Sequence, residues 1–404
     1  MNEKRILLVS HEMSVTGAPN SLLRQAGYFR SAGYAVDVWT YSGGALESRY
    51  RDAGFNPRPV EDDRKAIKVA YDARPGDYDL VICNTIRTYR AVDVLWHLGA
   101  PVAWFVRETK LLDEDFWLGG DFAALFRRFG NLYTVSPYAA GIVRRYNPHV
   151  RVICNSVPDA FVRAGTMTGR VRFGFIGSLI KVKGVDLLVA AFERIRQRFP
   201  NCELRIAGRL SVGIGEELRE RTRNDPAIVW LGEVQGEDKR VFFDSIDVLC
   251  VPSLDEPSGL TVLEGAMYGK ALITTDCTGA NYIVDDSCGR IVRAGDAGAL
   301  AVALSEFAAM DSSRLRSCCE RARERYLEAG SSRQERERVL AMVEEVRSAP
   351  SAKGRLRLAE KPWFHVTRYF DGRRRYYLGG LRLLTLHGKP YAGSPADRTG
   401  RTGR

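Results

Sequence analysis

The 404-residue sequence has no run of about 18 apolar residues without charges, and no early segment that joins a basic start to a long apolar core. We therefore expect neither a membrane-spanning helix nor secretion. None of the eight cysteines forms a C-x-x-C pair, and most lie in or beside apolar runs. Buried reduced thiols explain them better than disulfides or zinc ligands, which favours a cytoplasmic location.

Excess charge is lacking along most of the chain. The segment from Val346 to Arg404 holds 14 Lys and Arg residues against 3 Asp and Glu residues, which accounts for the whole net charge of +11. The preceding body is therefore neutral. A nucleic-acid-binding protein would normally carry its basic surface on the folded domain, so we expect no nucleic-acid partner.

Apolar strand-like segments alternate with helical patterns over the first 155 residues, and the alternation restarts at residue 171. Such alternation predicts parallel sheets covered on both faces. We expect an α/β protein of two Rossmann-like domains that face each other across a cleft, at residues 1–160 and 161–330. A helix at 331–347 would follow, with the option of crossing back to the first domain, and then a basic aromatic tail at 348–404.

The segment DEPSGLTVLEGAMYGK at 255–270 follows the apolar run VLCVP and has apolar residues at helical spacing. It predicts a strand, a tight turn and the start of a helix. The backbone N–H groups around Ser258, Gly259 and Leu260 would suit a diphosphate, and Glu264 could accept hydrogen bonds from hydroxyl groups. From the spacing alone, Glu256 as a turn cap and Glu264 as a solvated helix residue remain the simpler alternative.

Three further segments extend this pattern: FGFIGSLIKVKGVDLLVAAFERI at 173–195, WLGEV at 230–234, and SHEMSVTGAPNSLLRQAGYFRSAGYAVDV at 10–38. Together with 247–276, they resemble the family 4 retaining glycosyltransferases of the GT-B fold in order and spacing over roughly residues 1–345. The combination is specific, although no single motif is. The resemblance implies a nucleotide-sugar donor held by the second domain and an acceptor held by the first.

Carried over by position, the resemblance places Glu256 near the donor sugar, Glu264 at the ribose and Lys183 at the diphosphate. Gly17 stands where the family has a glycine-rich loop close to the phosphates, although an ordinary strand-to-helix turn explains it equally well. The sequence departs from the family at Ser178, where an arginine is common. Lys181 or Arg209 could supply the missing cation.

Many relatives also have a histidine after the fourth strand of the first domain, where this chain has WFVRETKLLDEDF. Arg107 and Glu108 occupy that region and could steady charge or orient an acceptor, or form an internal ion pair. His11 is a candidate acceptor-site residue, with a buried structural histidine as the alternative. Asp113 and Asp115 form a D-x-D that we interpret as a solvated acidic loop. We expect no required metal, and the absence of G-x-G-x-x-G gives no indication of a dinucleotide cofactor.

The resemblance therefore implies a retaining transfer of a sugar from a nucleotide-diphosphate sugar to a hydroxyl of a saccharide or lipid-linked saccharide, as in bacterial cell-surface polysaccharide or lipopolysaccharide synthesis. The alternatives are a nucleotide-sugar epimerase or hydrolase of the same fold, and a non-catalytic sugar-binding protein. No cofactor is expected beyond the nucleotide-diphosphate sugar as co-substrate.

In the tail, WFHVTRYF and RRRYYLGGLRLL flank Asp371-Gly372, which predicts a hairpin that interleaves aromatic and arginine residues. This composition suits the anionic inner face of a cell membrane. Packing of the hairpin on the body is the equal alternative.

Overall fold

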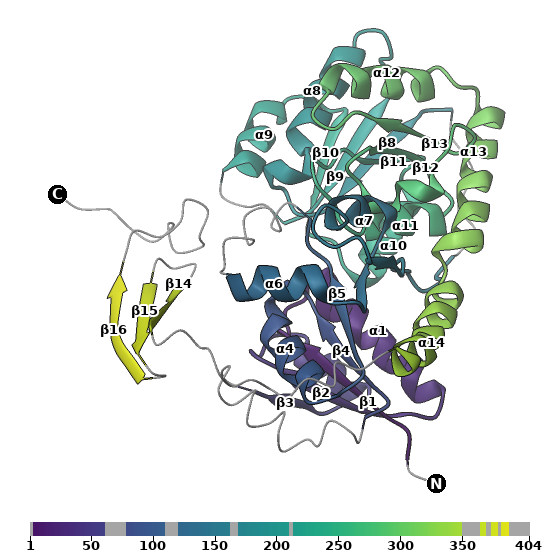
Figure 1. Cartoon of the computed structure of the whole chain (residues 1–404). Helices are drawn as coiled ribbons and strands as arrows, with labels where there is room; N and C mark the ends of the chain where they lie inside the picture. The colour runs from purple at the N-terminus through teal and green to yellow at the C-terminus, as the bar shows by residue number, and fades with distance from the viewer. Residues whose placement is uncertain are drawn as a thin grey trace.

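The computed structural model describes residues 3–60, 78–109, 120–161, 169–209 and 213–349, together with the backbone of three strands between residues 364 and 387. Two α/β domains, one above the other in Figure 1, make up the body. Each is built on a parallel sheet with helices on both faces. The predicted fold class is confirmed.

The N-terminal domain has a seven-stranded parallel sheet in the order β3-β2-β1-β4-β5-β6-β7. Its strands are β1 (Arg5–Ser10), β2 (Ala35–Thr40), β3 (Pro57–Pro59), β4 (Leu80–Asn84), β5 (Val102–Val106), β6 (Leu132–Thr134) and β7 (Arg151–Val152). Its described helices are α1 (Gly17–Ser31), α2 (Glu47–Asp52), η2 (Ile86–Thr88), α4 (Tyr89–His97), α6 (Gly120–Arg128) and α7 (Pro137–Val143). Strand β5 shows why the sequence runs are continuously apolar. Trp104 packs into the core on one face of the sheet and Phe105 into the core on the other, because successive side chains alternate.

The C-terminal domain has six parallel strands in the order β10-β9-β8-β11-β12-β13. The strands are β8 (Arg172–Ile176), β9 (Glu203–Ala207), β10 (Ile228–Gly232), β11 (Val248–Val251), β12 (Ala271–Thr275) and β13 (Gly289–Val292). The helices are η3 (Lys181–Lys183), α8 (Val185–Ile195), α9 (Ile214–Thr222), α10 (Gly236–Asp244), α11 (Leu260–Met267), η4 (Gly279–Ile283), α12 (Ala297–Ala308) and α13 (Ser312–Arg325).

Both sheets reverse their strand order at one point, between β1 and β4 in the first and between β8 and β11 in the second. Chains leaving neighbouring strands at such a point turn to opposite faces, which opens a crevice at the carboxyl ends of the strands. The fold therefore predicts one ligand crevice in each domain.

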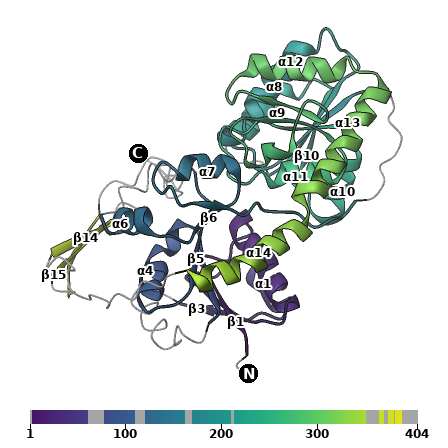
Figure 2. The same ribbon diagram turned by 45° about the vertical axis from the view of Figure 1, so that its right-hand side comes forward.

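The chain crosses between the domains twice. The linker after β7 leads into the C-terminal domain, and the π-helical turn η5 (Tyr326–Gly330) leads into α14 (Ser332–Ser348), which returns to pack beside α1 (Figure 2). The crossings run together, because Val157 and Ser331 form a parallel bridge. Val339 and Val343 of α14 complete the apolar core between α1 and the sheet. This docking ties the domains by packing as well as by covalent connection.

Several short elements were not predicted from the sequence. The edge strands β3 and β13 have only three and four residues, too few to show a period. In the tail, β14 (Phe364–Arg368) pairs antiparallel with β15 (Arg373–Leu378), and the unpredicted strand β16 (Leu381–His387) pairs with β15. The residues of the predicted turn lie outside the described residues. No helix within the described ranges is both long and apolar enough to cross a membrane.

Glu335 of α14 anchors the second crossing. Its side chain is 1% exposed. Its Oε2 accepts hydrogen bonds from Tyr28 Oη at 3.2 Å and from Ser156 Oγ, and lies 3.5 Å from Arg24 Nε. One carboxylate thus joins α1, the first crossing and the second.

We predict that Glu335→Ala lowers the free energy of unfolding by about 3 kcal/mol, because it leaves a half-buried guanidinium and two hydroxyls without their acceptor. Chemical denaturation would measure the change. Glu337→Ala on the same helix is the matched control, since its exposed pair with Arg333 should contribute under 1 kcal/mol. Equal effects of the two substitutions would contradict the anchoring role.

Candidate active site

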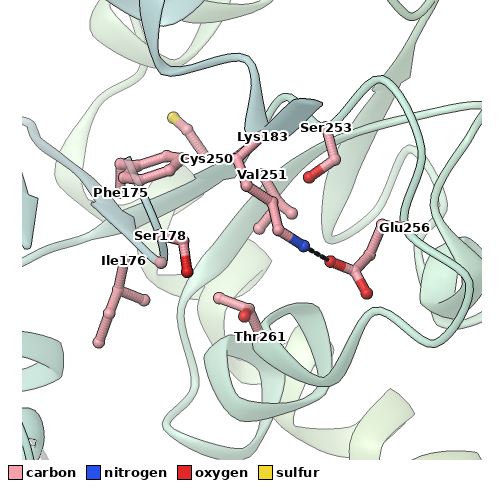
Figure 3. Close-up of a pocket in the computed structure, with 10 residues that line it drawn as sticks. Phe175, Ile176, Ser178, Lys183, Cys250, Val251, Ser253, Glu256 and Thr261 are labelled. Carbon is pink, nitrogen blue, oxygen red and sulfur yellow. Dashed lines mark hydrogen bonds and ion pairs between the residues drawn. The ribbon is translucent and has the colours of Figure 1, made fainter. Parts of the chain in front are cut away.

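A pocket of about 190 Å³ lies where β8 and β11 end, at the order reversal of the C-terminal sheet. Figure 3 shows its lining, which comes from the ends of both strands, the turn η3, the loop after β11 and the start of α11. The lining residues are Phe175, Ile176, Gly177, Ser178, Lys183, Cys250, Val251, Ser253, Glu256 and Thr261. Lys183 and Glu256, two residues predicted by the resemblance, therefore meet in one pocket with Ser178, which stands where the family commonly has an arginine.

Lys183 reaches this pocket because Gly184 follows it. Gly184 has φ of 68°, and a Cβ at that position would lie 2.0 Å from the carbonyl oxygen of Pro252. Only glycine lets the η3 turn approach the end of β11 this closely. Lys183 Nζ then forms an ion pair with Glu256 Oε2, the dashed contact in Figure 3.

Helix α11 begins beside the same pair. Its N-cap, Gly259, has φ of 73° and no side chain to cap the first N–H groups, and the first turn has no acidic residue. Glu256 Oε1 accepts a hydrogen bond from Gly259 N at 3.3 Å. A helix N-terminus attracts anions through its N–H groups and dipole, so a phosphate at Thr261 would meet both these groups and Lys183.

Glu264 lies on the next turn of α11 and is held by a lysine that the sequence did not single out. Lys239 Nζ of α10 lies 2.6 Å from Glu264 Oε1. Lys239 belongs to the charged stretch GEDKRVFFD, which carries no motif, and only the fold brings α10 beside α11. Both glutamates are thus paired with lysines from other elements, so that these four charges cancel.

The other residues predicted to bind the donor differ in how close they lie to this pocket. Gly17 at the start of α1 faces α11, since a Cβ there would lie 3.7 Å from Leu260 Cδ1. Ser258 Oγ accepts a hydrogen bond from Asn155 Nδ2 at 2.7 Å. Arg209, by contrast, has a side chain that is 82% exposed and pairs with Glu233 at 3.5 Å. Arg209 is not among the residues that line the pocket.

His11 and Thr85 follow β1 and β4, the strands at which the N-terminal sheet reverses its order. His11 Nδ1 lies 3.0 Å from Thr85 Oγ1. Burial lowers the pKa of His11, the nearby Arg87 lowers it further, and Glu12 opposes the shift. Thr85 has φ of 80°, the one positive value at a non-glycine among the described residues. A β-branched residue in this conformation is strained, and such strain is concentrated at functional sites.

Arg107 and Glu108, which follow β5, form no ion pair with each other among the contacts of the described residues; each binds other groups. The Arg107 guanidinium donates to Asn84 Oδ1 and, at 3.0 Å, to Asn155 Oδ1, and burial lowers its pKa to about 10. The Glu108 carboxylate accepts backbone N–H bonds from Ile86 at 3.2 Å and from Arg107 at 2.9 Å. The Ile86 contact braces the backbone directly after the strained Thr85.

Asp113 and Asp115 lie outside the described residues. Within the described ranges, no group of His, Cys, Asp and Glu residues could hold a metal ion. The proposal of a metal-free site therefore remains to be tested by experiment.

Burial raises the pKa of Glu108 to about 7, against the opposing effect of its backbone N–H partners. The folded state therefore binds this proton more tightly than the unfolded chain. The resulting stability is fully present below pH 4.5 and is lost as the pH rises towards 7.

We predict that Glu108→Gln, which cannot ionise, gains stability relative to the parent protein by on the order of 3 kcal/mol between pH 4.5 and 7.5. Parallel urea denaturation of both proteins across this range would measure the difference. Parallel stability profiles would show that Glu108 titrates normally.

Two family models match the sequence. The model described as "Glycosyl-transferase family 4" matches residues 2–113, and that described as "Glycosyl transferases group 1" matches residues 170–309. Among curated proteins, the chain is 34% identical over 125 residues to a phosphatidyl-myo-inositol mannosyltransferase of Mycolicibacterium smegmatis, covering 30% of this chain and 32% of that protein. It is 31% identical over 125 residues to a D-inositol 3-phosphate glycosyltransferase of Pseudarthrobacter chlorophenolicus, covering 30% of each. The matches therefore span about a third of these relatives' length.

Solved structures extend the likeness to the whole body. A glycosyltransferase from Rickettsia africae has a TM-score of 0.74 at 16% identity, covering 87% of this chain and all of that one. Anabaena HepE, solved with UDP and glucose, has a TM-score of 0.70 at 15% identity, covering 85% and 100%. At these identities, the likeness shows the fold. With both domain models matched in order on the two-domain fold, the chain belongs to the family 4 glycosyltransferases of the GT-B fold.

Proposed function

We propose that this protein is a retaining glycosyltransferase that moves a sugar from a nucleotide-diphosphate sugar to an acceptor hydroxyl. The observation that carries the proposal is the meeting of Lys183, Glu256 and the uncapped N-terminus of α11 in one pocket. A diphosphate needs a cation and convergent N–H donors, and this pocket offers both. HepE, which shares the fold, was solved with UDP and glucose, which supports the same class of donor.

In this proposal, Lys183 and the α11 N–H groups stabilise the charge that builds on the leaving diphosphate as the glycosidic bond breaks. Glu264 accepts hydrogen bonds from the ribose hydroxyls, oriented by Lys239. Gly17 brings the N-terminal domain close to the phosphates without a side chain. Arg209 and Lys181 have no assigned contact with the donor.

The stereochemical proposal follows from the lining of the pocket. Glu256 is its one carboxylate within the described residues, and the ion pair with Lys183 weakens it as a nucleophile. We propose that the departing phosphate oxygen takes the proton of the acceptor hydroxyl on the face from which it leaves. The bond from the anomeric carbon to phosphate breaks, the bond to the acceptor oxygen forms on the same face, and configuration is retained. No metal enters this step.

The acceptor is proposed to occupy the crevice of the N-terminal sheet. Among the described residues, His11 and Thr85 offer polar groups there that could bind a hydroxylated ligand. Glu108 holds the backbone after Thr85 in place. Arg107 acts on the site through Asn155. The curated relatives are named for inositol-based substrates, which supports a polyol or saccharide acceptor. We propose a cytoplasmic role in bacterial cell-surface polysaccharide or lipopolysaccharide synthesis.

The donor site can be tested by the competition between Glu256 and a diphosphate for Lys183. We predict that Glu256→Gln frees the lysine and binds a nucleoside diphosphate several-fold more tightly, corresponding to roughly 1 kcal/mol for a half-buried pair. Sugar transfer by the same variant should fall. Lys183→Ala should lose affinity by about 2 kcal/mol. Calorimetric titration with UDP, GDP and ADP would measure these changes.

The control for this experiment is Arg219→Ala, which removes an exposed cation from α9 in the same domain without altering the pocket. It should bind like the parent protein. Unchanged affinity in both Glu256→Gln and Lys183→Ala would refute the donor site. Tight binding without sugar transfer to any acceptor would favour a sugar-binding protein, and donor turnover without an acceptor would favour a hydrolase.

The tail is proposed to contact an anionic membrane surface where lipid-linked acceptors lie. The proposal rests on its composition, because the side chains of the tail lie outside the described residues. We predict that the full-length protein co-sediments with vesicles of anionic lipid at low salt and is released at 0.5 M salt, since about 1 kcal/mol per basic residue is screened. Neutral vesicles are the control. Equal sedimentation with both vesicle types would refute the proposal.

A further inference from the structure

The loop that carries Glu256 is hydrogen-bonded to the other domain. Four side chains that precede residue 160 donate hydrogen bonds to residues 255–258 across the domain junction, where Figures 1 and 2 show α7 beside the C-terminal domain. The contacts are Thr109 Oγ1 to Asp255 Oδ2 at 2.7 Å, Tyr138 Oη to Asp255 Oδ1 at 2.7 Å, Ser136 Oγ to Pro257 O at 2.6 Å, and Asn155 Nδ2 to Ser258 Oγ at 2.7 Å.

Glu256 lies in the middle of these interdomain contacts, but its side chain points into the C-terminal domain. Its neighbours on both sides bind the N-terminal domain, while its own carboxylate pairs with Lys183 in the donor pocket. The backbone of Glu256 is also fixed within its own domain. Its N–H donates to Cys277 O at 2.9 Å, and its carbonyl oxygen accepts from Gly279 N at 2.7 Å. A shift of the loop against either neighbour would therefore move the Glu256 carboxylate.

Asp255 makes the strongest of these interdomain contacts. Both of its carboxylate oxygens accept a hydroxyl of the N-terminal domain, one from Thr109 and one from Tyr138. Hydrogen bonds to a charged acceptor are about twice as strong as neutral ones. Thr109 is 2% exposed, so this hydrogen bond to Asp255 is shielded from water.

These contacts have no role in holding either domain together, because they join residues 117 and 146 positions apart in different domains. We propose that Asp255, Tyr138 and Thr109 form an interdomain latch that positions Glu256 for sugar transfer. They are positioning residues, and this role rests on the proposed function. The latch couples the contact between the domains to the geometry of the donor site. Glu256 is correctly placed relative to an acceptor in the first domain only when the hydrogen bonds to Asp255 are formed.

The latch predicts a split between binding and turnover. The side chains proposed to hold the diphosphate and the ribose, Lys183 and Glu264, both come from the C-terminal domain, so loss of the latch should change nucleotide affinity little. Transfer requires the Glu256 carboxylate in place against the acceptor side. A misplacement of about 1 Å can lower a rate on the order of 100-fold.

The test uses Tyr138→Phe and Asp255→Asn in the full-length protein. Each should bind nucleoside diphosphate within twofold of the parent, keep its KM for the donor, and lose at least tenfold in kcat. Hydrogen–deuterium exchange of the backbone around residues 253–262 should become faster. Tyr133→Phe is the matched control, because it removes another tyrosine-to-carboxylate hydrogen bond, to Glu345 of α14 at 3.1 Å, which does not involve residues 255–258. It should change neither kcat nor the exchange of the loop.

Unchanged kcat and unchanged exchange in Tyr138→Phe would overturn the latch. If Asp255→Asn fails to fold, Thr109→Val tests the second arm of the same contact. The exchange measurement needs no substrate. If the parent protein binds no nucleotide, the proposed function fails while exchange still decides whether the latch exists. If the parent binds and turns over donor but the variants do so equally well, only the latch fails.

Discussion

The ion pair between Lys183 and Glu256 is the contact on which the account of the site depends. Charges at contact distance attract each other more strongly where water is partly excluded, so each group affects what the other can bind. Glu264 and Lys239 repeat the arrangement one turn further along α11. The four charges therefore cancel within the site. In the proposed function, a diphosphate replaces Glu256 as the partner of Lys183, and the carboxylate is then free to face the sugar.

This arrangement requires close approaches that only particular residues allow. Gly184 carries η3 against the end of β11, and Gly259 turns the chain into α11 where a Cβ would lie 2.7 Å from Ala280 N. Both glycines have positive φ, so a side chain would be strained there as well as crowded. The two sheets share one strand order, so each has one order reversal, with the pocket of Lys183 and Glu256 at one and with His11 and Thr85 at the other. Two copies of one architecture thus supply the two halves of one candidate site.

Much of this architecture could be predicted from the sequence because its signals are local. The apolar runs that became β1, β2 and β5 have the predicted bounds, and the segment 255–270 after the run VLCVP correctly predicted a turn and a helix start. Lys183 and Glu256 were predicted to share a site by resemblance, and the fold brings them into contact. Lys239 was missed because a lysine in a charged helix has no local signature, and its partner is 25 residues away.

The contacts between the domains could not be predicted for a similar reason. Asp255 and Tyr138 belong to different domains, and their contact depends on how the two domains dock, which no periodicity in the sequence records. Arg209 was predicted from its position as a cation for the phosphates; its side chain is largely exposed and pairs with Glu233, and its contact with a donor stays a prediction. Arg107 and Glu108 were considered as an ion pair or as acceptor groups. In the structure, Arg107 donates hydrogen bonds to two asparagine side chains, and Glu108 accepts them from backbone N–H groups.

The most direct measurement is a crystal structure of the protein with a non-hydrolysable nucleotide-diphosphate sugar. The account predicts a diphosphate between Lys183 Nζ and the first N–H groups of α11, a ribose within hydrogen-bond distance of Glu264, and a sugar beside Glu256 that faces the N-terminal crevice. A nucleotide bound in the N-terminal crevice, or a diphosphate out of reach of Lys183 with the Lys183–Glu256 pair intact, would contradict it.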